Sequence, residues 1–153
     1  MSSTATQVDV RFAARKPWVP AAGNLRRWVN LALKGRGVMR AALSIHVVGS
    51  RASRSLNARY RRKDAPTNVL SFAGAGISPS GVTFLGEIVI CAPVLAREAR
   101  QQGKSLHSHW AHITVHGVLH LLGFDHIETR QAGKMARLET QILESMGFSN
   151  PYR

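Results

Sequence analysis

Acidic residues are scarce in this chain, which has 8 Asp and Glu against 21 Lys and Arg among its 153 residues. The resulting formal net charge of +13 favours a polyanionic partner, either a nucleic acid or an anionic membrane surface. A basic surface that only keeps the protein in solution is the alternative that charge alone leaves open.

Cysteine and long hydrophobic runs are also nearly absent. Cys91 is the single cysteine, so the chain forms no internal disulfide, as suits a reducing cytoplasm. It lies in the apolar run IVIC, which favours a buried thiol over a nucleophile. No stretch approaches about 18 uncharged apolar residues, and the first residues, MSSTATQVDVRF, lack the apolar core of a signal peptide. We therefore expect a cytoplasmic protein without a membrane span.

The length and the hydrophobic fraction of 44% predict one globular domain over residues 1–153 with a core of its own. Hydrophobic periodicity predicts four strands, at 8–13, 42–48, 68–72 and 82–90. It predicts five helices, at 23–37, 50–62, 93–103, 105–122 and 130–146. Strands and helices do not alternate strictly, so the fold class is α+β. The small residues at 73–81, AGAGISPSG, predict an exposed loop.

Two of these helices have informative faces. The helix at 105–122 is apolar around nearly its whole circumference, which is typical of a central helix. The helix at 50–62 places Ala52, Leu56 and Tyr60 on one face, opposite a face that carries Arg51, Arg54 and Arg61.

The segment HGVLHLLGFDH, residues 116–126, concentrates histidine in the central helix and just after it. His116 and His120 are four residues apart, so their rings project from one face of the helix. Gly123 can end the helix in a left-handed conformation, after which His126 can return toward the other two rings. Three imidazoles would leave a fourth tetrahedral position for water, as in a catalytic zinc site. The alternative is hydrogen-bonded core histidines, and this is how we interpret His109 and His112.

The spacing matches the metzincin pattern HExxHxxGxxH at every histidine and at the glycine. However, Gly117 occupies the position of the glutamate that serves as general base in those proteases. Asp125 and Glu87 are acids that could handle a proton near the site. A turn or helix cap for Asp125, and a structural hydrogen bond for Glu87, are equally open.

Phosphoryl chemistry has different requirements. Zinc can activate water and polarise a phosphoryl oxygen, arginine can neutralise developing charge, and RNA supplies its own 2′-hydroxyl nucleophile. The segment RASRSLNARYRRKD carries six Lys and Arg between residues 51 and 63. These cations could engage RNA, or they could form an ordinary solvated helix face.

Three segments in the same order, LNARYRRKDAPTNVLSF, LGEIVIC and HGVLHLLGFDH, resemble the YbeY family of bacterial endoribonucleases. The resemblance implies a mixed four-stranded sheet and a zincin-like central helix. It also implies a cytoplasmic, zinc-dependent, single-strand endoribonuclease that matures the 3′ end of 16S rRNA and acts in ribosome biogenesis and quality control. Ribosomal RNA and the ribosome or its associated proteins would be the partners. The metal ligands would be His116, His120 and His126, and the functional arginine Arg61.

Two other function classes remain as alternatives at this point. A metalloprotease or other metallohydrolase would use the same histidines, but the glutamate missing at position 117 opposes a protease. A non-catalytic RNA-binding factor with a structural zinc ion is opposed by the lack of a fourth protein ligand. Three imidazoles also suit nickel or copper, so the residues favour zinc without fixing the metal.

Overall fold

The computed structural model describes residues 5–124, 129–148 and 151. Nine elements follow one another, and each predicted element is present. The strands are β1 (Ala5–Phe12), β2 (Arg40–Val48), β3 (Val69–Ile77) and β4 (Thr83–Cys91). The helices are α1 (Ala22–Leu33), α2 (Ser50–Arg61), α3 (Ala92–Gln102), α4 (Leu106–Leu121) and α5 (Thr129–Ser145).

The strands form one mixed sheet in the order β1-β2-β4-β3. β1, β2 and β4 run parallel, and β3 pairs antiparallel with β4 through a short connection. This arrangement confirms the α+β class and the mixed four-stranded sheet. β1 and β3 are the edges of the sheet, so one side of the β3 backbone is not paired with another described strand.

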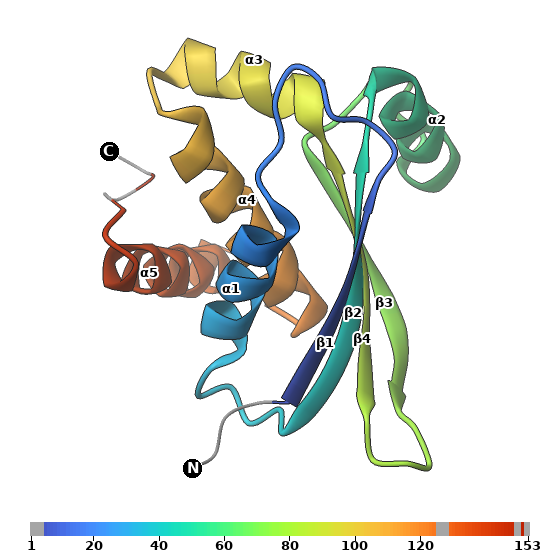
Figure 1. Cartoon of the computed structure of the whole chain (residues 1–153), viewed down its shortest axis with the longest axis vertical. Coiled ribbons are helices and arrows are strands. Elements are labelled where there is room, and N and C mark those ends of the chain that lie inside the picture. Colours follow the sequence, from blue (N-terminus) through green and yellow to red (C-terminus); the bar gives the residue numbers. More distant parts are fainter. Residues whose placement is uncertain (1–4, 125–128, 149–150, 152–153) are drawn as a thin grey trace.

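Helix α4 is central, as its all-round apolar sequence predicts. It packs against α1, α3 and α5 as well as against β3 and β4. Figure 1 shows α1, α4 and α5 on one face of the sheet and α2 on the other. The large core between α4 and the sheet contains side chains from both, including Trp110, Val118, Ile45 and Ile88. This packing holds α4 against the sheet.

A smaller core lies on the other face, under α2. Its buried residues are Val48, Leu70, Val89, Cys91 and Val94, with Leu56 and Phe72 packed against them. Cys91 is 1% exposed, which confirms the prediction of a buried thiol. In the ranges that the structure describes, no helix is long and apolar enough to cross a membrane.

The loop predicted at 73–81 is wrong in its first half, because β3 continues to Ile77. The pairing with β4 shifts register between Ala73 and Gly76, which marks a bulge. Gly86 of β4 faces this bulge with φ of +136°, and a Cβ there would lie 2.0 Å from the carbonyl oxygen of Phe72. Within the predicted loop, Gly74 is under the same constraint, because a Cβ there would lie 2.4 Å from the carbonyl oxygen of Phe84.

The most buried residues of α2 belong to neither of the two sets of residues described from the sequence. Its exposed residues include Ala52 and Tyr60, and its buried residues are the polar Ser53 and Asn57. Ser53 Oγ accepts from the backbone N–H of Thr67 at 2.9 Å and donates to its carbonyl at 3.0 Å. Asn57 donates to the carbonyl of Ala65 at 2.8 Å. These bonds satisfy buried polar groups and hold the 62–68 connection against α2.

Candidate functional site

Three histidines of α4 lie in a row because they are four residues apart. The ring centroids of His112 and His116 are 6.3 Å apart, and those of His116 and His120 are 4.9 Å apart. The sequence therefore predicts correctly that His116 and His120 project from one face. Of the other predicted site residues, His126 lies outside the described residues, as does Asp125.

The turn that follows α4 has the predicted form. Gly123 has φ of +98°, and its N–H donates to the carbonyl of His120 at 3.0 Å. The N–H of Phe124 donates to the carbonyl of Leu119, also at 3.0 Å. These two bonds are typical of a helix that ends on a left-handed glycine. The chain thus reverses direction directly after His120.

Glu139 of α5 lies fully buried beside the row of histidines. One carboxylate oxygen accepts from Nδ1 of His116 at 2.5 Å, and the other accepts from Nε2 of His112 at 2.9 Å. Burial lowers the pKa of His112 from its ordinary value, although the carboxylate acts in the opposite direction. His112 is thus favoured in its neutral form, as a donor through one nitrogen.

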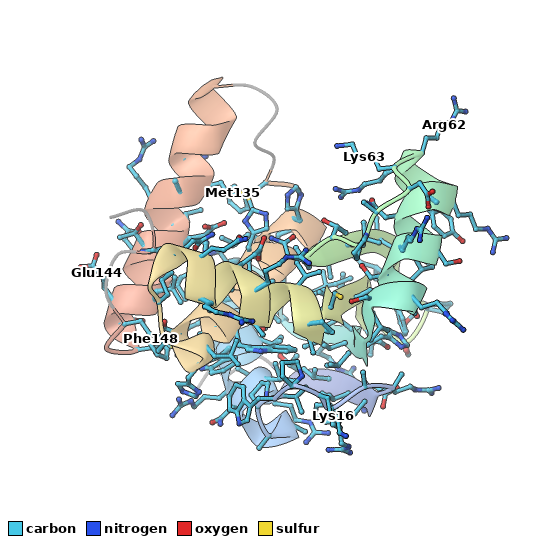
Figure 2. The ribbon with its side chains drawn as sticks, turned by 90° about the horizontal axis from the view of Figure 1, so that it is seen from above. Lys16, Arg62, Lys63, Met135, Glu144 and Phe148 are labelled. Atoms are coloured by element: carbon cyan, nitrogen blue, oxygen red, sulfur yellow. The ribbon has the colours of Figure 1, made fainter. Side chains whose placement is uncertain are left out.

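Sequence reasoning missed Glu139, although a signal was present. The buried face of α5 carries Met135, Ile142 and Leu143, and Glu139 falls between them. Figure 2 labels Met135 on this helix. An acid on the apolar face of an amphipathic helix must have a partner inside the protein, because an unpaired buried carboxylate is costly. Here the partners are the two histidines.

The donor chemistry of this cluster fits a metal ion. His112, His116 and Glu139 each offer a ligand atom, and these atoms lie within 4.8 Å of one another. Only His116 belongs both to this group and to the set predicted from the sequence. A histidine that gives one nitrogen to a carboxylate and the other to a metal is also a common arrangement in metal sites. The geometry therefore supports a metal site at His116.

Gly117, where metzincins have glutamate, faces the sheet rather than the row of histidines. A Cβ at this position would lie 2.9 Å from Cγ2 and 3.3 Å from Cδ1 of Ile88. Its carbonyl accepts from Ser71 Oγ of β3 at 3.2 Å. Glycine is thus required for the close packing of α4 on the sheet, and a longer side chain here would meet Ile88.

Glu87 does not lie near the histidines of α4. It alternates with Ile88 along β4, so it faces the opposite side of the sheet, where it lines a cavity with Tyr60 and Phe72. Its side chain is 54% exposed, and its Oε1 lies 3.3 Å from Nε2 of His46. The possibility that Glu87 serves as a base beside His116 is therefore wrong.

Arg61 is the last residue of α2 and is exposed. Within the part of the chain that the structure describes, its side chain forms no hydrogen bond or ion pair. It follows Tyr60 at the end of the helix, next to Arg62 and Lys63, which Figure 2 shows projecting outward. The structure does not bring Arg61 into contact with the histidines, since α2 lies on the other face of the sheet.

Comparison with known proteins gives the family. The model of the family described as endoribonuclease YbeY matches residues 19–147, which is most of the chain. The chain belongs to the YbeY family of endoribonucleases. It is 51% identical over 150 residues to endoribonuclease YbeY of Stenotrophomonas maltophilia strain K279a, with 95% of this chain and 92% of that protein covered. The protein of the same name in strain R551-3 matches over the same length with the same identity.

Membership of the YbeY family confirms two predictions: the resemblance found in the sequence, and an enzyme that acts on RNA. The fold also has a solved counterpart. The solution structure of TM1509 from Thermotoga maritima superposes with a TM-score of 0.64 at 22% sequence identity, over 90% of this chain and 87% of that one. At this identity, the similarity supports the fold alone.

Proposed function

We propose that this YbeY-family chain is a zinc-dependent endoribonuclease for single-stranded RNA. Its role would be maturation of the 3′ end of 16S rRNA, with further roles in ribosome biogenesis and quality control. We further propose that residues 1–153 act as one domain in the cytoplasm, together with the ribosome or ribosome-associated proteins. The family assignment and the charge of +13 support RNA as the substrate.

One observation supports the metal site above all others: Glu139 holds Nδ1 of His116 beside the ring of His120. With Nδ1 bonded to a carboxylate, His116 can bind a metal only through Nε2. We propose His116, His120 and His126 as the three ligands. The fourth position would be open to solvent and substrate, as in catalytic zinc sites.

The alternative ligand set, His112, His116 and Glu139, is less suited to catalysis. Both oxygens of Glu139 already accept hydrogen bonds from imidazoles, and the residue is fully buried. A metal held there would be enclosed, whereas a nuclease needs a position that a phosphate can reach. The side chain of His116 is 21% exposed and that of His112 is 12% exposed, so access increases along α4 from His112 to His116.

The chemistry can be divided among the residues. Zinc, when bound, supplies a Lewis acid that lowers the pKa of a water molecule and polarises a phosphoryl oxygen. Glu139 fixes the tautomer and orientation of His116 and makes its Nε2 a better ligand. Arg61, on the other face of the sheet, contacts a phosphate of the RNA away from the cleaved bond and holds the strand for cleavage. Gly117 cannot transfer a proton. The nucleophile would therefore be either a water molecule at the metal site or the 2′-hydroxyl of the RNA.

The test combines metal analysis of the purified protein with RNA cleavage in the presence and absence of a chelator. We expect one zinc ion per chain and cleavage that stops on chelation and returns on zinc addition. His116→Ala, His120→Ala and His126→Ala should each lose metal and activity. His107→Ala is the matched control, because His107 lies on the same helix but packs against Trp28, with ring centroids 5.2 Å apart.

Three results would contradict the proposal. The first is stoichiometric metal in the His116→Ala, His120→Ala double variant. The second is RNA cleavage that is unaffected by chelator. The third is digestion of casein but not of RNA, which would favour a metalloprotease instead.

A further inference from the structure

A concave site lies on the face of the sheet opposite the histidines of α4. It is a cavity of ≈ 390 Å³. Its lining residues are His46, Val48, Leu56, Tyr60, Phe72, Glu87 and Val89. This volume falls within the range of small-molecule sites, and most of the wall is aromatic or aliphatic. The proposed metal chemistry uses none of these residues.

The aromatic wall is suited to stacking. Tyr60 is 56% exposed although it is a large hydrophobic residue, and its ring meets that of Phe72 edge to face at 5.0 Å. The guanidinium carbon of Arg59 lies 5.6 Å from the centroid of the Tyr60 ring. Exposed aromatic rings beside arginine are the combination with which proteins bind the bases of single-stranded nucleic acids.

The charges around the cavity separate a place for phosphate from a place for a base. Arg61, Arg62 and Lys63 follow Tyr60 directly and are exposed, so the rim beyond Tyr60 is cationic. The wall of the cavity instead carries the carboxylate of Glu87. A phosphate would be repelled by this carboxylate and attracted to the rim. The carboxylate would instead accept a hydrogen bond from the amino group of a base.

β3 connects the cavity with the histidine helix. Ser71 points to α4, where its hydroxyl donates to the carbonyl of Gly117 at 3.2 Å, while the next residue, Phe72, lines the cavity. Neighbouring residues of a strand face opposite sides of a sheet, so one strand separates the two sites. β3 is an edge strand, and a flexible RNA strand could therefore pass from one face to the other around it.

We propose that this cavity is a subsite for one unpaired nucleobase of the RNA, and that it prefers adenine, cytosine or guanine to uracil. The base stacks on Tyr60 and Phe72, and its amino group donates to Glu87. The adjoining phosphates contact Arg61 and Arg62. The inference rests on the proposed function only in taking single-stranded RNA as the ligand, because binding at this site needs neither metal nor cleavage.

The test measures binding of ten-nucleotide RNAs to the full-length protein with chelator present. The RNAs are all uracil, or uracil with one central adenine, cytosine or abasic residue. We expect the RNA with a single adenine or cytosine to bind about 10-fold more tightly than the all-uracil and abasic RNAs, because only a base with an amino group can donate to Glu87. In those two RNAs, only a uracil can occupy the cavity. Tyr60→Ala should remove this gain. Tyr60→Leu, which keeps an apolar side chain but cannot stack, should remove most of it.

Two more variants test the role of Glu87 and provide a control outside the cavity. Glu87→Gln should reduce the preference for adenine and cytosine over uracil, because an amide can donate to a uracil carbonyl as well as accept. Phe84→Ala is the matched control: Phe84 is 48% exposed on the same strand but outside the cavity, and the preference should remain.

Two results would overturn the proposal: equal affinity for all four RNAs, or a base preference that persists in both Tyr60 variants. A protein side chain would then be the candidate occupant of the cavity. Its failure can be told apart from failure of the nuclease proposal. Chelator-sensitive cleavage without a base preference would refute the subsite alone. A base preference that depends on Tyr60, in a protein that cleaves no RNA, would refute the nuclease alone.

Discussion

Glu139 of α5 accepts a hydrogen bond from Nδ1 of His116 in α4, at 2.5 Å and across 23 positions of sequence. The same carboxylate accepts from His112. This buried carboxylate joins the last helix to the central helix. Under the proposed ligand assignment, it determines which nitrogen of His116 is directed to the metal.

The first prediction concerns this carboxylate. Glu139→Gln should weaken zinc binding by about 10- to 100-fold, the usual effect of removing a carboxylate that orients a metal-binding histidine. The amide can accept from only one imidazole, and its NH₂ group opposes the N–H of the other. Competition with a chromophoric chelator measures the affinity. Glu144→Gln, at an exposed position of the same helix, is the control and should bind zinc normally. Unchanged affinity in Glu139→Gln would refute the orienting role.

The second prediction concerns Arg61. Arg61→Ala should lower kcat/KM for RNA cleavage by about 10-fold or more, mainly through a higher KM, which is the scale for loss of one charge-assisted hydrogen bond to the RNA. Arg61→Lys should recover only part of the rate, because lysine cannot hold two phosphate oxygens in one plane. Zinc content and Tm should stay near wild type, since Arg61 is exposed. Arg51→Ala, on the first turn of α2, is the control. An Arg61→Ala protein that cleaves normally would exclude the role.

The third prediction concerns Gly117. Gly117→Ala should destabilise the protein by up to about 2 kcal/mol, because overpacking of the new methyl group against Ile88, about 1–3 kcal/mol, exceeds the roughly 1 kcal/mol that alanine gains over glycine in a helix. In an Ile88→Ala background the same substitution should cost much less, since the opposing side chain is gone. Gly133→Ala in α5 meets only the end of the Arg137 side chain and should be neutral or stabilising. Urea denaturation measures the wild type, the Gly117→Ala, Ile88→Ala and Gly133→Ala variants, and the double variant at 117 and 88. Additive costs at 117 and 88 would contradict the packing argument.

The fourth prediction is a pH dependence of stability. Burial by itself would raise the pKa of Glu98, but hydrogen bonds from His109 and Asn68 outweigh it and hold the pKa below its ordinary 4.5. A carboxyl with a lowered pKa stabilises the fold above about pH 4.5, and this stabilisation is lost as the pH falls through the folded-state value. Glu98→Gln should therefore be less stable than wild type at pH 7, by about 1–3 kcal/mol.

The difference between wild type and Glu98→Gln should shrink as the pH is lowered below 4.5. Denaturation curves at pH 7, 5 and 4 give the comparison, with Glu144→Gln as an exposed control. A difference that stays constant over this range would mean that the charge of Glu98 has no part in the effect.

The fifth prediction concerns salt. Affinity for single-stranded RNA should fall steeply as salt rises, because lysine and arginine side chains release counterions when they neutralise phosphates. Arg62→Ala combined with Lys63→Ala should make the dependence shallower, since both exposed side chains lie at the end of α2. Fluorescence anisotropy at increasing salt measures the slope. RNA affinity that does not depend on salt would contradict the nucleic-acid assignment.

The elements themselves could be predicted from sequence, because hydrophobic periodicity is a local property. It indicated the nine elements and the central position of α4, and the spacing of His116 and His120 indicated a shared helix face. Gly123 could be predicted as the end of α4, because a left-handed residue after a helix is best occupied by glycine. In each case the residues that decide the structure lie within a few positions of one another.

Tertiary structure decided what depends on contacts between distant segments. Glu139 reaches His116 only because α5 packs on α4, and no local pattern encodes that pairing. Glu87 faces away from the histidines because strand alternation is fixed by Ile88, which packs against α4 at Gly117. β3 extends beyond Phe72 because backbone pairing with β4 outweighs the weak strand preference of small residues. Sequence alone thus indicated the residue types of a metal site, while helix and sheet packing determined which acid supports them.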